Sequence, residues 1–152
     1  MNLSALELKV YPLLLLAIFA VASVMTAFLP TMTPLNMMLA TWVLISAGFA
    51  IAVWGVVEFR RASTTVDPTK VGKVSKLVTS GPFRFTRNPM YVGMTLCLLG
   101  IQLGWGAWPS LLLAPLFIAY ITRFQIIPEE RAITDIFGVS FIQYCQRVRR
   151  WL

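Results

Sequence analysis

The sequence predicts an all-α polytopic membrane helix bundle with four transmembrane helices and a C-terminal interfacial helix. The chain has 152 residues, of which 58% are hydrophobic and only 12% are charged, a composition typical of integral membrane proteins. No Asp, Glu, Lys or Arg occurs between Lys9 and Glu58, or between Arg87 and Arg123. Each uncharged interval is long enough for two spans of about 20 residues. We therefore expect residues 1–152 to form a single integral membrane domain.

Turn-forming residues divide the first uncharged interval. Pro30, Pro34 and Asn36 disfavour a continuous helix, so helices are predicted near Tyr11–Leu29 and Met38–Val57. A cleaved signal peptide is the competing interpretation of the first helix, because small residues follow its apolar run. The residues that precede this run are barely basic, which favours a membrane span.

The second interval is divided in the same way. Gly104, Gly106 and Pro109 interrupt it, which predicts helices near Pro89–Leu103 and Trp108–Thr122. The interval therefore supplies the third and fourth predicted spans.

The C-terminal segment, Arg123–Leu152, is predicted to contain an amphipathic helix that lies on the cytosolic membrane surface. Apolar residues recur there at helical spacings: Ile133, Ile136, Phe137, Tyr144, Val148 and Trp151. Gly138 is a position at which this helix can break or bend.

The distribution of basic residues predicts the topology. Seven of the 13 basic residues lie between Arg60 and Arg87 and five between Arg123 and Arg150, whereas the connections near 30–36 and 104–108 contain none. Cytosolic loops of membrane proteins carry such an excess. We expect both basic segments and both termini to be cytosolic, in a cell inner membrane or its equivalent.

The residue types exclude several kinds of active site. Histidine is absent, which excludes Ser-His-Asp and Cys-His catalysis. Cys97 and Cys145 have no paired spacing, so neither a metal site nor a disulfide framework is predicted. The segments outside the helices are too short for a nucleotide-binding Rossmann domain, and no nucleic acid partner is expected.

Two polar clusters border the predicted spans. Gly81–Gly93 reads GPFRFTRNPMYVG, in which Asn88 is a preferred N-cap and Pro89 a preferred first helical residue. The sequence Pro128-Glu129-Glu130 has the same features of a helix start. Capping is the structural explanation of each cluster by itself. Because both starts would lie at the cytosolic edge of the membrane, their positive ends could together bind an anionic group.

Side chains around these helix starts predict a ligand. Arg84 and Arg87 can donate to a carboxylate or phosphate, whereas Glu129 and Glu130 can accept from hydroxyls or pair with an ammonium. Three aromatic rings that could hold a flat base or anchor at the interface lie in the first cluster: Phe83, Phe85 and Tyr91. The site suits a ligand with a carboxylate, an ammonium, hydroxyls and an aromatic base.

The first cluster resembles the Gly-x-Tyr-x-x-x-Arg-His-Pro-x-Tyr-x-Gly stretch of the isoprenylcysteine carboxyl methyltransferase family and its phospholipid methyltransferase relatives. The similarity continues through Glu129-Glu130 and Phe137-Gly138 to Tyr144 and Arg147-Val148, and so covers roughly 74–152. It implies a membrane-embedded enzyme that binds S-adenosyl-L-methionine at the cytosolic face.

The resemblance also implies residue roles. Carried over by position, the cofactor-binding candidates are Leu77, Val78, Phe83, Asn88, Pro89, Met90, Tyr91 and Glu129. Our own hypothesis adds Arg87, which together with Asn88 would orient the methyl donor. The catalytic candidates are Arg87, Asn88 and Glu130. The expected methyl acceptor is a lipid or small apolar molecule that enters laterally from the bilayer.

Departures from the family pattern affect these expectations. Asn88 occupies the position of the His in the family motif. Ser75 occupies the position of a second His that family members often have a few residues before Leu77-Val78. Asn can position a cofactor but cannot act as a general base. Family members specific for prenylcysteine are expected to hold its carboxylate with an Arg, and Gln125 occupies that position here. Arg123 is nearby but is expected to point elsewhere. A prenylcysteine acceptor is therefore disfavoured.

Methyl transfer tolerates the absence of His, because it depends on alignment and on exclusion of water more than on proton transfer. An acceptor that is already a carboxylate or thiolate requires no base. Phospholipid headgroups, isoprenoid acids, small thiols and quinone precursors all remain open as acceptors. The alternatives are a non-catalytic four-helix membrane partner or scaffold, and a family member with degenerate activity; transport is disfavoured because the spans lack ionisable residues.

Overall fold

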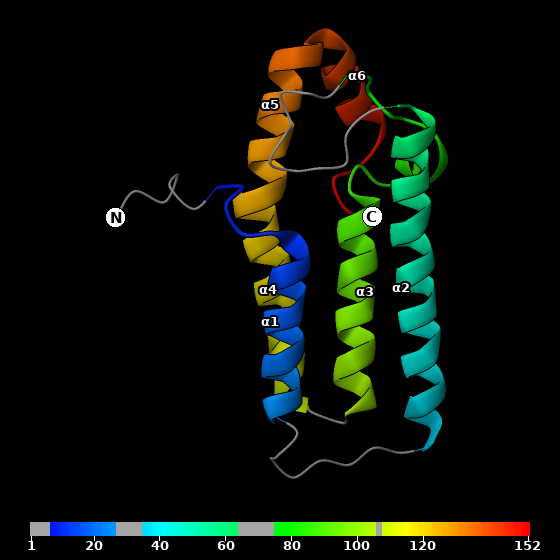
Figure 1. Cartoon of the computed structure of the whole chain (residues 1–152), viewed down its shortest axis with the longest axis vertical. Helices are drawn as coiled ribbons and strands as arrows, with labels where there is room; N and C mark the ends of the chain where they lie inside the picture. The colour runs from blue at the N-terminus through cyan, green and yellow to red at the C-terminus, as the bar shows by residue number, and fades with distance from the viewer. Residues whose placement is uncertain (1–6, 27–34, 64–74, 106–107) are drawn as a thin grey trace.

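The computed structural model describes residues 7–26, 35–63, 75–105 and 108–152, and these residues form helices without any β-strand. Four helices run side by side in Figure 1: α1 (Pro12–Met25), α2 (Leu35–Arg61), α3 (Pro89–Gly104) and α4 (Leu113–Ile121). The predicted all-α class is therefore confirmed for this part of the chain. Helix α2 begins before Asn36, which was expected to lie in a turn, whereas Pro30, Pro34 and Gly106 lie outside the described residues.

Two helices are long and apolar enough to cross a membrane, Met37–Arg61 and Ser110–Phe137. Only 17% of the apolar window of the first helix and 33% of that of the second are buried, whereas a core helix of a soluble protein would be mostly buried. Helices α1 and α3 have 14 and 16 residues. Their lengths of about 21 and 24 Å fall short of a hydrocarbon core about 30 Å thick. The structure supports a helical membrane bundle, and the number of four spans stays a prediction.

The last long helix differs from the prediction, which ended it at Thr122. Helix α4, the π-helical segment η6 (Thr122–Ile126) and α5 (Ile127–Phe137) follow one another within the continuous helix Ser110–Phe137. The predicted helix start at Pro128 is therefore wrong. Proline has no N–H to donate to the preceding turn, and the wider π-helical turn immediately before it accommodates this missing bond.

Helices α2 and α3 lie side by side (Figure 1), and they approach each other closely at Gly48 and Gly93. A Cβ added to Gly48 would lie 2.5 Å from the carbonyl oxygen of Gly93, and one added to Gly93 would lie 2.4 Å from that of Gly48. Such small residues let helix backbones pack at short range in membrane proteins. This close packing holds α3, which begins at the motif, against α2.

The buried core lies beneath the motif, between α1, α3 and α4. Leu98, Phe117, Ile121 and Ile126 have no exposed surface, and Tyr91 of the motif belongs to the same cluster. Phe19 of α1 packs edge-on against Phe117, with ring centroids 5.5 Å apart. The motif helix is thus fixed at its first turn by the core.

The chain reverses direction after α5. Gly138 ends α5 with a φ of +51°, a conformation that a residue without Cβ adopts at little cost. The short helix α6 (Val139–Arg147) follows, and the last residues return to the start of α3, as Figure 1 shows. The predicted bend at Gly138 is confirmed.

The C-terminal helix is shorter than expected and is held by the motif. On α6, Phe141 and Tyr144 are buried, whereas Val139 and Ile142 are exposed. The Tyr144 hydroxyl donates to the carbonyl oxygen of Phe83 at 2.6 Å. One face of α6 therefore packs inward, and contact of its exposed apolar face with lipid stays a prediction.

Candidate functional site

A cavity of about 670 Å³ lies at the end of the bundle where α3 begins. Its walls come from α1, α2, α3, α5 and α6 and from the segment that precedes the motif. Eight of the nine cofactor-binding candidates line it, together with Glu130: Leu77, Val78, Phe83, Arg87, Asn88, Met90, Tyr91 and Glu129. Residues far apart in the sequence therefore meet in one cavity.

Pro89 is the candidate that does not line the cavity. It is fully buried and faces Gly55 of α2, where an added Cβ would lie 3.3 Å from the proline ring. Its position is that of a helix-packing residue at the first turn of α3.

The motif begins at a tight turn anchored to α2. Gly81 has a φ of +56°, and a Cβ there would lie 2.7 Å from Glu58 Cγ. The Ser80 hydroxyl donates to Glu58 Oε2 at 2.5 Å. The sequence reasoning missed Glu58, although it is the first charged residue after the long uncharged interval. This buried carboxylate ties the end of α2 to the motif.

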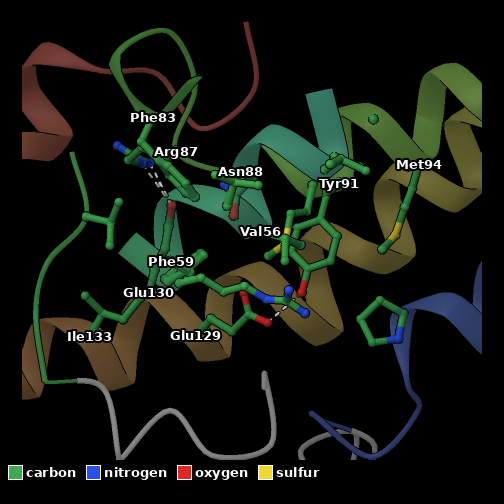
Figure 2. Close-up of a pocket in the computed structure, with 18 of the residues that line it drawn as sticks. Val56, Phe59, Phe83, Arg87, Asn88, Tyr91, Met94, Glu129, Glu130 and Ile133 are labelled. Atoms are coloured by element: carbon green, nitrogen blue, oxygen red, sulfur yellow. Dashed lines mark hydrogen bonds and ion pairs between the residues drawn. The ribbon is translucent and has the colours of Figure 1, made fainter. Parts of the chain in front are cut away.

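Arg87 is held by the C-terminal part of the chain. Its guanidinium donates to Glu130 Oε1 from Nε at 3.1 Å and from Nη2 at 2.8 Å (Figure 2). Its Nη1 donates to the carbonyl oxygens of Cys145 and Val148 at 3.2 and 3.1 Å. Arg150 also pairs with Glu130, at 2.6 Å. These contacts bind Arg87 to Glu130 and to α6, and they bind Glu130 to Arg150.

Asn88 lines the cavity but does not cap α3 with its side chain. Its Nδ2 donates to the carbonyl oxygen of Arg150 at 2.9 Å, and its backbone N–H donates to Thr86 Oγ1 at 3.2 Å. The Thr86 hydroxyl donates to the same Arg150 carbonyl. The start of α3 and the chain's last residues therefore form one hydrogen-bonded unit.

Tyr91 and Glu129 form the second polar pair of the cavity. The Tyr91 hydroxyl donates to Glu129 Oε1 at 2.6 Å, and Figure 2 shows the two side chains directed toward each other. Tyr91 is 4% exposed. Because the bond uses one carboxylate oxygen of Glu129, its other oxygen remains available as an acceptor.

Aromatic rings cover the side of the cavity next to α2. Phe59 and Phe83 pack edge-on with ring centroids 5.1 Å apart, and both line the cavity. Phe59 was missed because it lies near the end of α2, where nothing in the sequence distinguishes it from the many other hydrophobic residues of that helix. Phe85, an aromatic candidate, is 69% exposed and lies outside the cavity lining.

Tyr144 of α6 lines the cavity, and its hydroxyl binds the backbone of Phe83 on this side. Burial raises the pKa of Tyr144 above its usual value, so the hydroxyl stays protonated at neutral pH. It can therefore keep donating to the Phe83 carbonyl.

Only one of the two expected helix starts faces the cavity. Helix α3 begins at Pro89, directly after Asn88, but Glu129 and Glu130 lie inside the continuous helix. The two acids therefore reach the cavity from the side of a helix, and the idea of two positive helix ends is wrong.

Arg123 and Gln125 both lie in the π-helical segment η6. Arg123 pairs with Glu7 at 2.7 Å, which confirms that it points away from the cavity. Gln125 is 1% exposed, and its Nε2 donates to the carbonyl oxygen of Val10 at 2.7 Å. Neither side chain lines the cavity, so neither can hold an acceptor there.

Comparison with known protein families shows which family the chain is related to. The family model described as phospholipid methyltransferase matches residues 35–140, which include α2, the motif and both acids of α5. The chain belongs to the phospholipid methyltransferase family. The similarity recognised in the motif is thereby confirmed. The match ends before Arg150, so the C-terminal contacts of Arg87 and Asn88 lie beyond it.

Two curated relatives are similar to parts of the chain. The protein-S-isoprenylcysteine O-methyltransferase of Schizosaccharomyces pombe is 31% identical over 93 residues, which cover 61% of this chain and 39% of that enzyme. An uncharacterised protein of Haemophilus influenzae is 44% identical over 63 residues, which cover 39% of this chain and the whole of that protein. The chain thus spans well under half of the enzyme that it matches. No solved structure matches the chain.

Proposed function

We propose that this protein is an S-adenosylmethionine-dependent methyltransferase that acts on a lipid or small apolar acceptor at the cytosolic face of the membrane. The observation that carries the proposal is a single cavity in which Asn88, Tyr91 and Glu129 form a polar end and apolar side chains form the rest. Family membership supplies the reaction class. The chain acts as one integral membrane domain with both termini in the cytosol.

The residues present fit S-adenosylmethionine. Glu129 offers an acceptor oxygen for ribose hydroxyls or the ammonium, and Tyr91 orients it. Phe59 and Phe83 provide an aromatic wall for the base. The cavity volume of about 670 Å³ lies within the range of about 300–1,000 Å³ that is usual for cofactor sites.

When bound, S-adenosylmethionine supplies a methyl group whose C–S bond breaks, with its electron pair left on sulfur, as an acceptor lone pair forms the new bond. The chain's own part is alignment and exclusion of water. Asn88 orients the bound groups, because its side chain is itself fixed by Arg150. Arg87 and Glu130 act as positioning residues that hold α6 against the cavity.

An acceptor that reaches the site already as an anion suits this chain. None of its residues is a histidine, and Asn88 cannot take up a proton. A carboxylate or thiolate can attack without a general base, whereas an ammonium must first lose a proton. Gln125, which is bound to Val10, offers no cation for a prenylcysteine carboxylate.

Calorimetric titration of the purified protein with S-adenosylhomocysteine tests the proposal. We expect saturable binding that weakens in Glu129→Gln and is unchanged in Phe85→Ala, whose side chain lies outside the cavity. Absence of binding by a protein that still melts cooperatively would overturn the proposal. Mass spectrometry of lipid extracts incubated with the protein and isotopically labelled cofactor then identifies the acceptor.

One observation favours a second candidate function, that of a non-catalytic membrane partner. Arg87 binds Glu130 and α6, and Glu130 also binds Arg150, which is what a purely structural network would do. Cofactor affinity that is unchanged in both Arg87→Ala and Glu129→Gln would indicate a structural role for these two residues.

A further inference from the structure

The charged side chains of the cavity are unequally paired. Of the five that line it, Arg87, Glu129 and Glu130 have partners within the protein. The other two, Arg60 and Lys76, are exposed at the cavity, and their side chains make no hydrogen bond or ion pair with the residues that the structure describes. The cavity rim therefore carries positive charge that the described residues do not compensate.

Arg60 ends an apolar face of α2. Five residues at the spacing of one helical face line the cavity: Phe49, Ala52, Val53, Val56 and Val57. Arg60 continues this face in the last turn of the helix. The rise per residue gives the face a length of about 16 Å from Phe49 to Arg60. A cation at one end of an apolar track is complementary to an amphiphile with an anionic head.

The opposite wall of the track is also apolar. Met90, Met94 and Cys97 line it from α3, and Leu13 and Leu16 line it from α1. Methionine side chains adapt to ligands of irregular shape. The track can therefore hold an alkyl or isoprenoid chain.

The cavity opens along the side of the bundle. Phe49 and Val53 line it and yet are 68% and 43% exposed. Both belong to the candidate span Met37–Arg61, so their exposed surfaces face lipid in a membrane. An amphiphile can enter from the bilayer with its head at the level of Arg60.

We propose that Arg60 and Lys76 form a subsite for the anionic headgroup, a phosphate or carboxylate, of an amphiphilic methyl acceptor whose chain lies along the Phe49–Val57 face. The inference rests on the proposed function and names the charge class of its acceptor. An amine headgroup is disfavoured, because Arg60 and Lys76, the charged cavity side chains that the described residues leave unpaired, are both cations.

The two cations are distinct from the polar contacts assigned to the cofactor, although Phe59 and Leu77, which are assigned to the cofactor, are their chain neighbours. Arg60 lies on the same face of α2 as the apolar track, whereas Asn88, Tyr91 and Glu129 reach the cavity from α3 and α5. Removing the two cations should therefore change acceptor binding without changing cofactor binding.

The test compares three single-chain probes that differ in headgroup: dodecyl phosphate, laurate and zwitterionic dodecylphosphocholine. Their affinities for the purified full-length protein in neutral detergent are measured with wild type and with the double variant Arg60→Gln/Lys76→Gln. The matched control is Arg84→Gln/Arg149→Gln, because these exposed cations do not line the cavity. Calorimetric titration with S-adenosylhomocysteine is run on every variant, and thermal melts check folding.

The proposal expects wild type to bind an anionic probe more tightly than dodecylphosphocholine. In Arg60→Gln/Lys76→Gln the affinity for that probe should fall about tenfold, with no change in the control pair or in the affinity for S-adenosylhomocysteine. A fall for dodecyl phosphate alone assigns a phosphate head, and a fall for laurate alone assigns a carboxylate.

Three results would overturn the subsite. The first is an equal loss of affinity for the anionic probe in both double variants. The second is a loss of affinity for S-adenosylhomocysteine without a loss of affinity for the probe. The third is that wild type binds neither anionic probe more tightly than dodecylphosphocholine. Absence of S-adenosylhomocysteine binding in wild type would instead count against the proposed methyltransferase, so the two failures can be told apart.

Discussion

Arg87 and Glu130 form a mostly buried ion pair, with 2.8 Å between Nη2 and Oε1 and with 12% and 16% of their side chains exposed. The same guanidinium donates to two backbone carbonyls next to and within α6. Motif, acid pair and C-terminal helix are thus joined through one side chain. Arg87, which was a catalytic candidate from the sequence, therefore lies at the centre of a network of contacts that positions α6.

Replacing Arg87 should therefore destabilise the protein. In Arg87→Ala, Glu130 keeps Arg150, but two carbonyls lose their donor, so we expect a loss of about 2–3 kcal/mol of unfolding free energy. Denaturant unfolding in detergent measures it. Arg84→Ala, which removes an exposed arginine outside the cavity, should change stability little. Equal stability of the two variants would contradict the network.

Tyr91→Phe tests the pair formed with Glu129. The variant removes the hydroxyl that donates to Glu129 Oε1, so the carboxylate loses its fixed orientation. We expect the affinity for S-adenosylhomocysteine to fall about fivefold, the equivalent of one hydrogen bond. Tyr120→Phe is the control, because Tyr120 does not line the cavity. If the two variants bind equally well, Tyr91 has no part in orienting Glu129 for the ligand.

Adding a methyl group at the contact between α2 and α3 should strongly destabilise the protein. Gly48→Ala and Gly93→Ala each place Cβ within 2.5 Å of a backbone oxygen, which cannot move without separating the helices. We expect each to cost about 1–3 kcal/mol or more. In Gly55→Ala the nearest atom is the flexible Met90 side chain at 3.1 Å, so the cost should be smaller. Thermal melts rank the variants, and the reverse order would exclude this close packing.

The segment before α1 is expected to loosen in acid. Leu8 N–H donates to the Phe124 carbonyl in the π-helical segment at 3.0 Å, and Glu7 pairs with Arg123. The hydrogen bond from Arg123 holds the pKa of Glu7 below its usual value. A carboxyl with a lowered folded-state pKa stabilises the folded form above its unfolded pKa, and this contribution is lost as pH falls through the folded pKa.

Hydrogen exchange at Leu8 measures this effect. We expect its protection factor to be constant near neutral pH and to fall below the usual pKa of a glutamate. In Glu7→Gln the protection should be lower at neutral pH and independent of pH over this range. A wild-type protection factor that does not change in acid would show that the ion pair does not hold the segment.

Much of the helical arrangement was predictable, because long intervals without charge leave few alternatives to membrane helices. The starts of α1 and α3 were placed within one residue by Tyr11 and Pro89. The extension of the last helix to Phe137 was not predicted. Pro128 looked like a helix start, and sequence alone does not show that a π-helical turn lets the helix continue through it.

The candidate site was predicted in part. Asn88, Tyr91 and Glu129 were selected by motif and resemblance, and the fold brings them into one cavity. Glu58 and Arg150 were missed, because neither belongs to a local pattern. Their roles arise from contacts with Ser80 and Glu130 that form only when distant segments pack together.

The sequence by itself determined that this chain is a helical membrane protein with a methyltransferase-like motif, because hydrophobic run length, charge placement and a contiguous motif are local properties. Only the tertiary structure decided which charged side chains have partners. Glu130 is neutralised by Arg87 and Arg150, and Glu129 is bound by Tyr91, whereas Arg60 and Lys76 at the cavity rim have no side-chain partner in the part of the chain that the structure describes. The physical reason is that pairing depends on distances of about 3 Å between side chains far apart in sequence.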